Sequence, residues 1–141
     1  MIRNTLTVEK SIEEVFDYAA QFDRHLEWQD NLKGATINGP PAVGVTGTAT
    51  RKMGPRVHTQ EWRMSAYERP RIVGREILNG PMRPTGTMRF SAEGTSTRVD
   101  FEMALNPQGL MKLIGPLIER QGQKINTGYL AKFKDILEKP R

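Results

Sequence analysis

Residues 97–138 of the chain read TRVDFEMALNPQGLMKLIGPLIERQGQKINTGYLAKFKDILE, and this stretch changes its hydrophobic period half-way along. Over residues 97–105 nearly every second side chain is apolar, which predicts a β-strand with one buried face and one wet face. After Pro107 apolar residues recur at helical spacing, in a stripe of Ile114, Leu117, Ile118, Ile125, Tyr129, Phe133, Ile136 and Leu137. Because Pro116 has no backbone N–H to donate, the helix proper is predicted over 116–138, about 34 Å long at ~1.5 Å per residue.

The chain opens with a strand and two short helices. Residues 2–8 (IRNTLTV) alternate and carry β-branched side chains, so they are predicted to form the first strand. Ser11 and Glu14 have the spacing of a capping box, in which the serine hydroxyl accepts a hydrogen bond from an otherwise unpaired backbone N–H at the start of the helix. They predict an amphipathic helix over 11–21, and a second short helix follows over 23–29.

The middle of the chain consists of short strands separated by turns. Gly or Pro marks five turn-like strings: NGPP (38–41), MGPR (53–56), ERPR (68–71), NGPMRP (79–84) and EGTS (93–96). The strands predicted between them cover 32–38, 45–53, 57–67, 71–78 and 84–91. No helical period separates these strands, so each is expected to pair antiparallel with its neighbours in sequence. The order of elements predicts an α+β fold, in which a curved seven-stranded antiparallel sheet wraps around the long C-terminal helix and two short helices lie between the first and second strands.

Composition limits the function classes. The 141 residues are typical of one domain, predicted to span 1–141, and the absence of cysteine excludes disulfides, thiolate metal sites and cysteine nucleophiles. The chain has no apolar run of signal-peptide length near its start and no stretch of the ~20 apolar residues that span a bilayer, so a cytoplasmic location without membrane insertion is expected. The net charge of +5 comes from scattered Lys and Arg interleaved with acids, which is typical of a solvated surface and predicts no nucleic-acid partner.

Several short strings resemble one known family. Residues 8–28, VEKSIEEVFDYAAQFDRHLEW, resemble its opening, where a strand leads into a helix with a Val-Phe core and then into a loop ending in tryptophan. The later turns, hairpin and closing helix of the family are resembled by PAVG (41–44), AYERP (66–70), EGTSTRVDF (93–101) and LAKFKDILE (130–138). Taken in order, these strings resemble the START-like (SRPBCC) superfamily, and within it the polyketide cyclase/dehydrase-like proteins. The resemblance implies a helix-grip fold over essentially the whole chain, as a single START-like ligand-binding domain.

The resemblance implies an internal cavity but no particular chemistry. The superfamily includes lipid carriers, hormone and metabolite binders, cyclases and chaperone-activating domains, and it has no universal catalytic motif. The expected ligand is a hydrophobic small molecule, such as a lipid, a polyketide or an aromatic metabolite, bound between the sheet and the final helix. The alternative is a polyketide cyclase or dehydratase that acts in the same cavity. A third class is a partner-binding module with an exposed apolar patch. Either a monomer or a homodimer is compatible with the sequence.

Candidate ligand contacts are residues with inward phase on the predicted strands and the final helix. They are His58, Trp62, Met64, Met88, Phe90, Phe101, Met103, Ile118, Ile125 and Tyr129. Methionines suit an adaptable binding surface, and they equally suit ordinary core filling. His58 is either a polar anchor in the pocket or an exposed residue at a strand end. An enzyme would need His58 or Tyr129 as its acid or base, and the sequence assigns neither a catalytic role.

Other conspicuous residues are given structural roles. Trp28 is expected either to pack beneath the short helices or to touch a ligand at the pocket mouth, whereas His25 is expected to be exposed. Charged strand residues such as Arg63 and Arg75 are predicted to form surface ion pairs. The two histidines lie far apart in sequence, and no phosphate loop or dinucleotide fingerprint occurs, so neither a metal nor a cofactor is expected. The segment GLMKLIGPL (109–117) is predicted to form either a mobile lid or the start of the long helix.

Overall fold

The computed structural model describes residues 1–139, apart from the side chain of Met53. Its strands are β1 (Ile2–Val8), β2 (Leu32–Ile37), β3 (Thr46–Met53), β4 (Arg56–Glu68), β5 (Ile72–Ile77), β6 (Thr85–Glu93) and β7 (Ser96–Ala104). The helices are α1 (Ile12–Ala20) and α2 (Gly115–Glu138), with the 3₁₀ helices η1 (Phe22–Glu27) and η2 (Gly109–Ile114). No helix in the described part of the chain combines the length and the apolar character needed to cross a bilayer.

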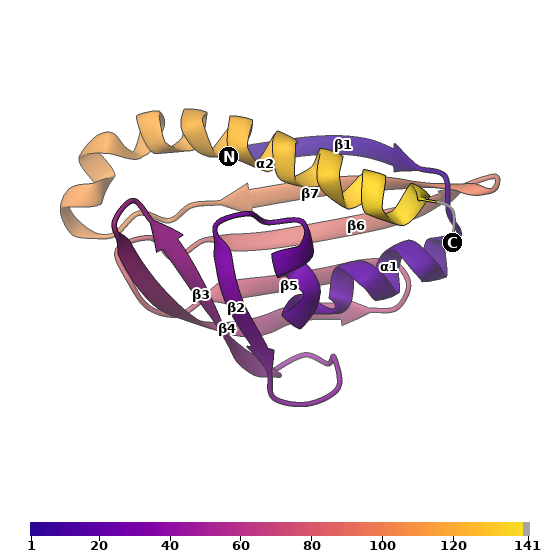
Figure 1. The fold of residues 1–141 in the computed structure, drawn as a ribbon, viewed down its shortest axis with the longest axis horizontal. Helices are drawn as coiled ribbons and strands as arrows, with labels where there is room; N and C mark the ends of the chain where they lie inside the picture. The colour runs from indigo at the N-terminus through magenta and orange to yellow at the C-terminus, as the bar shows by residue number, and fades with distance from the viewer. Residues whose placement is uncertain (140–141) are drawn as a thin grey trace.

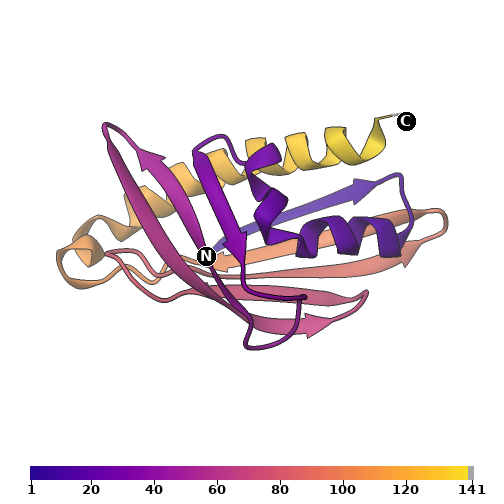
Figure 2. The same ribbon diagram turned by 60° about the horizontal axis from the view of Figure 1, so that its bottom comes forward.

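The strands form one antiparallel sheet in the spatial order β1-β7-β6-β5-β4-β3-β2 (Figure 1). Each strand from β2 to β7 pairs with its neighbour in sequence, and β1 pairs with β7. The register shifts between Met64 and Ala66 in β4 and between Leu32 and Gly34 in β2. Such irregularities bend a strand and increase its twist, and Figure 2 shows β2, β3 and β4 turned steeply across the other strands. The predicted curved sheet with a long C-terminal helix is confirmed.

Helix α1 begins at the predicted cap. The Oγ of Ser11 accepts a hydrogen bond from the backbone N–H of Glu14 at 3.3 Å, and the Glu14 carboxylate accepts one from the Ser11 hydroxyl at 3.2 Å. The helix buries Val15 and Phe16 against the sheet. The Phe16 ring meets Phe90 of β6 edge-on, with 5.2 Å between the ring centroids, which is a favoured aromatic geometry. Large apolar side chains therefore fill the interior beneath α1.

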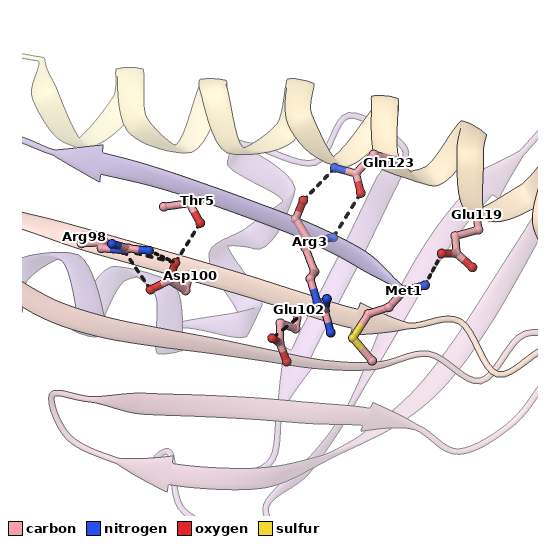
Figure 3. A network of polar contacts seen from close by, with 8 residues as sticks. All are labelled: Met1, Arg3, Thr5, Arg98, Asp100, Glu102, Glu119 and Gln123. Atoms are coloured by element: carbon pink, nitrogen blue, oxygen red, sulfur yellow. Dashed lines mark hydrogen bonds and ion pairs between the residues drawn. The ribbon is translucent and has the colours of Figure 1, made fainter.

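Helix α2 runs beside β1, one of the two edge strands (Figures 1 and 2). An edge strand has backbone N–H and C=O groups without a strand partner. The side chain of Gln123 in α2 serves as the missing partner of the Arg3 backbone. Its Oε1 accepts a hydrogen bond from the Arg3 N–H at 3.1 Å, and its Nε2 donates one to the Arg3 carbonyl at 2.9 Å (Figure 3). One turn later the Nδ2 of Asn126 donates to the Asn4 side chain at 2.8 Å. Polar contacts thus fix the position of the helix along β1.

The interior beneath α2 changes along the helix. Toward its C-terminal end, Phe133 is fully buried and contacts the rings of Tyr18 and Trp28, with centroid distances of 5.6 and 5.2 Å. In its first half the inward-facing positions include Gly122 and Asn126, which are small or polar and fill less space. The same helix therefore completes the core at one end and leaves room at the other.

Candidate functional site

A cavity of about 270 Å³ lies between the sheet and the first half of α2. This volume is close to the lower end of the ~300–1,000 Å³ range of small-molecule pockets. One wall is apolar and comes from β5, β6 and β7, with Val73, Ile77, Met88, Phe101 and Met103. The opposite wall comes from α2, and η1 closes one side. Concave, mainly apolar surroundings of this kind are what an apolar ligand requires.

Two glycines, Gly86 and Gly122, help to keep the cavity between the sheet and α2 open. Gly86 of β6 lies between Arg75 of β5 and Met103 of β7 in the register of the sheet. A Cβ built on Gly86 would have its nearest neighbours at 3.8 Å, so this part of the wall has room for a side chain that the sequence does not supply. A Cβ on Gly122 would instead lie 2.8 Å from Cδ1 of Ile2, so glycine allows α2 to approach β1 closely. The helix can therefore rest on the sheet edge while the cavity stays open beside it.

The 3₁₀ helix η1 and Trp28, which follows it directly, place three rings in the cavity wall. Since a 3₁₀ helix has three residues per turn, Phe22, His25 and Trp28 fall on one face, and all three line the cavity. The His25 ring lies 4.9 Å from the Phe22 centroid and 4.6 Å from that of Trp28. The expectation that His25 is exposed is wrong: the residue is 3% exposed, because the three-residue period aligns it with these aromatic neighbours. For Trp28, the structure shows both packing against Phe133 and a place in the cavity wall.

His25 is a neutral imidazole with a defined tautomer. Its Nε2 lies 2.8 Å from the carbonyl oxygen of Ala19, and since a carbonyl only accepts, Nε2 carries the proton. Its Nδ1 is then an acceptor for the Nε2 amide of Gln29 at 3.5 Å. Burial, and next the positive charge of Arg75, hold the pKa of His25 well below its usual value.

Two arginines, Arg51 of β3 and Arg75 of β5, line the same cavity. Arg51 donates to the side-chain oxygens of Gln60 at 2.9 Å and Asn31 at 3.0 Å, both of which are uncharged partners. The Cζ of Arg75 lies 5.1 Å from the centroid of the Phe22 ring. Burial lowers the pKa of both guanidinium groups, and for Arg75 the nearby charge of Arg51 lowers it further, to about 9, so both remain cations at neutral pH.

Tyr129 of α2 brings a hydroxyl to the cavity. Burial raises the pKa of Tyr129, while Arg51 and a backbone hydrogen bond from Asn31 act in the opposite direction. The polar part of the wall thus gathers the groups of His25, Arg51, Arg75, Asn126 and Tyr129. Its charged members are both positive.

Nearly the whole chain matches one known protein family. The match covers residues 2–138, and the family is described as polyketide cyclase / dehydrase and lipid transport. The chain belongs to this family. No curated protein sequence matches the chain.

The fold of this chain recurs in solved structures. The protein TTHA0849 from Thermus thermophilus is 14% identical and aligns with a TM-score of 0.78 over 95% of this chain and 94% of its own. The Zhui aromatase/cyclase from Streptomyces sp. R1128 is 11% identical, with a TM-score of 0.75 over 97% and 92% of the two chains. A START superfamily protein from Mycobacterium smegmatis is 14% identical, with a TM-score of 0.74 over 97% and 96%. At these identities the likeness establishes the helix-grip fold, and not a ligand.

Five of the predicted contact residues line the cavity, namely Met88, Phe101, Met103, Ile118 and Tyr129. They come from β6, β7 and α2, and the alternation of β7 places Phe101 and Met103 on the inner face. Their contact with a ligand stays a prediction.

The other five do not line the cavity. Trp62, Met64 and Phe90 have inward phase but are fully or almost fully buried among core side chains, where Phe22 covers the Trp62 ring at 4.9 Å and Phe16 covers Phe90. His58 is exposed although it shares the phase of Gln60, because the hairpin of β3 and β4 extends past the cavity wall. Ile125 is 53% exposed, since it precedes the buried Asn126 by one residue and is turned by about 100° from it.

Arg51 and Arg75 were not predicted to line the cavity. Arg63 does form the predicted surface pair, with Glu76, but Arg75 is on the opposite face of β5. A signal was present, because Val73, Arg75 and Ile77 share one phase of an alternating strand, and two of the three are plainly core residues. An arginine in the same alternation phase as β-branched core residues therefore indicates a cation in the protein interior.

The segment 109–117 is the start of the long helix in this structure. Residues 109–114 form η2, and α2 follows directly. Leu110 and Leu113 of η2 are 85% and 81% exposed, so this turn presents apolar side chains to solvent next to Ile118 at the cavity wall.

Proposed function

We propose that this protein binds a hydrophobic small molecule in the cavity between β5–β7 and α2. The observation that carries the proposal is the cavity itself, about 270 Å³ with an apolar wall of strand residues. Burial of apolar ligand surface, at roughly 25 cal/mol per Å², supplies the driving force. Membership of a family described by polyketide cyclase, dehydrase and lipid transport supports the same class of ligand.

A variant that fills the cavity tests this proposal. Gly86→Val adds a branched side chain where the nearest atoms to a Cβ are 3.8 Å away. Since valine also suits a strand better than glycine does, the fold is expected to keep its stability. We expect compounds found by native mass spectrometry and thermal-shift screening with lipids and aromatic polyketides to bind Gly86→Val at least about tenfold more weakly.

The control for this variant is Gly34→Val. Gly34 of β2 pairs with Thr50, does not line the cavity, and would place a Cβ in ordinary contact at 3.9 Å. It should bind the same compounds as the unchanged protein. Equal binding by Gly86→Val, or no binder for the unchanged protein across the whole screen, would contradict the proposed function.

A second candidate function is a polyketide cyclase or dehydratase reaction in the same cavity. It is favoured by two groups capable of proton transfer in the cavity wall, the neutral imidazole of His25 and the hydroxyl of Tyr129. His58, the histidine favoured by sequence, lies outside the cavity and is no longer a candidate for this role.

Turnover of a poly-β-ketone substrate mimic separates an enzyme from a carrier. If the cavity is catalytic, His25→Phe or Tyr129→Phe lowers turnover by the ~10²–10⁴-fold typical of a lost general acid or base. His58→Gln, at an exposed site, serves as the control and should have no effect. Turnover that neither cavity variant alters would exclude acid–base catalysis by these two groups.

A further inference from the structure

The cavity contains two cations and no counter-charge from the described part of the chain. Every lining residue is apolar, uncharged polar, or one of Arg51 and Arg75, and no Asp or Glu of residues 1–139 lines the wall. Among residues 1–139, the side chain of Arg51 donates only to the neutral side chains of Gln60 and Asn31. The guanidinium of Arg75 has no hydrogen bond or ion pair with the same described residues, and it lies over the face of Phe22.

Two surface arginines, in contrast, pair with carboxylates. Arg63 pairs with Glu76, and Arg69 donates to both carboxylate oxygens of Asp17 at 2.7 and 2.8 Å. These pairs lie on the surface, where such interactions contribute little. Within residues 1–139, no carboxylate lines the cavity, where an unpaired charge costs more and a paired charge interacts more strongly than at the surface. A group that arrives with the ligand is the natural source of the missing negative charge.

We propose that the ligand is an amphipathic carboxylic acid, whose carboxylate pairs with Arg75 beside Arg51 and whose apolar body lies along Met88, Phe101 and Met103. This inference rests on the proposed function and specifies its ligand class. A guanidinium presents a planar fork of donors that matches a carboxylate in bidentate geometry. Arg51 already donates to two neutral partners, whereas Arg75 has no hydrogen-bond partner in the described part of the chain. The unused donors of Arg75 therefore suit a single carboxylate.

Ligands that differ only in head-group charge test this proposal. Titration calorimetry compares decanoic acid with decan-1-ol and decylamine, and naphthylacetic acid with naphthylethanol, so that two apolar bodies are sampled. We expect each acid to bind at least about tenfold more tightly than its alcohol, and the amine to bind most weakly. Alcohols that bind as well as their acids would overturn the carboxylate proposal and leave the proposed function intact. If none of the five compounds binds, the carboxylate proposal is overturned. The proposed function would still be upheld if uncharged lipids or polyketides bind in the native mass spectrometry and thermal-shift screen.

Replacement of Arg75 gives an independent readout. Arg75→Met should abolish the preference for acid over alcohol, keep alcohol binding, and raise the Tm of the ligand-free protein, because it removes a half-buried cation that has no counter-charge among residues 1–139. The matched control is Arg89→Met, which removes the same charge from an exposed position on β6 and should leave the acid preference unchanged. An Arg75→Met protein with a lower Tm and an unaltered acid preference would show that Arg75 is structural, which would overturn the proposal.

Discussion

The imidazole of His25 is almost fully buried and uses its one proton to bond the carbonyl of Ala19. Since burial and Arg75 hold its pKa in the folded protein below the ~6.5 of an unfolded chain, the unfolded state binds more protons than the folded state below pH 6.5. The contribution of His25 to stability is therefore fully present above about pH 6.5 and is lost as the pH falls below it. We expect the free energy of unfolding to fall by about 1 kcal/mol between pH 7.5 and 5.5, since one titrating group changes it by at most ~1.4 kcal/mol per pH unit.

Urea unfolding at several pH values measures this dependence. The carboxyls with lowered pKa values, such as those of Asp17 and Asp100, titrate below this window. His25→Phe should therefore flatten the curve between pH 5.5 and 7.5. A slope that survives in His25→Phe would show that another group carries the pH dependence.

Trp62 depends on a glycine across the sheet. It is fully buried opposite Gly47, and a Cβ on Gly47 would collide with the carbonyl oxygen of Thr36 and with the Trp62 ring itself. We expect Gly47→Ala to destabilise the fold by about 1–3 kcal/mol, the usual range for overpacking a core. Gly128→Ala is the opposite control, because a Cβ there meets nothing within 4 Å and alanine favours a helix. Thermal unfolding of the two variants should shift Tm in opposite directions, and an unchanged Tm in Gly47→Ala would contradict the packing argument.

At the scale of elements, polar side chains add to the apolar packing between α2 and β1. The side chain of Gln123 forms hydrogen bonds with both the N–H and the C=O of Arg3, as a neighbouring strand would. Gln123→Ala should cost about 1 kcal/mol, since two partly exposed hydrogen bonds are lost to water. It should also raise the hydrogen-exchange rate of the Arg3 amide, whereas Lys124→Ala, at an exposed neighbouring position, should not. An Arg3 amide that exchanges equally fast in both variants would show that the bond to Gln123 does not protect the edge.

Elements with a strong local period could be predicted from the sequence, and those without one could not be placed fully. The strand over 97–105 and the helix over 116–138 form within one residue of their predicted ends, because alternation and the 3.6-residue stripe are local signals. The six residues of η1 are too few to distinguish a period of 3.0 from 3.6, so the burial of His25 was missed. His58 was given the correct phase, but its exposure depends on how far a hairpin extends, which is a property of the whole sheet.

At the scale of the molecule, the interior divides into a filled end and a hollow end. Phe16, Phe90 and Phe133 occupy the first, and the cavity occupies the second. A list of inward-facing residues does not distinguish these two ends, since the volume between a sheet and a helix depends on how closely they approach. Gly122, which allows the close approach of α2, and Gly86, which leaves room in the wall, carry no hydrophobic signal in the sequence. This is why half of the predicted contacts line the cavity while the rest lie in the core or at the surface.

The methionines provide probes of whether a ligand enters this cavity. In a protein labelled with ¹³C at the methionine methyl groups, NMR titration with a binder from the screen reports each position separately. Met88 and Met103 line the cavity, Met64 is buried outside it, and Met1 is at the surface. If a ligand enters the cavity, the Met88 and Met103 methyl groups show saturable shifts, with little change at Met64 and Met1. Saturable binding that leaves Met88 and Met103 unshifted would contradict binding in this cavity.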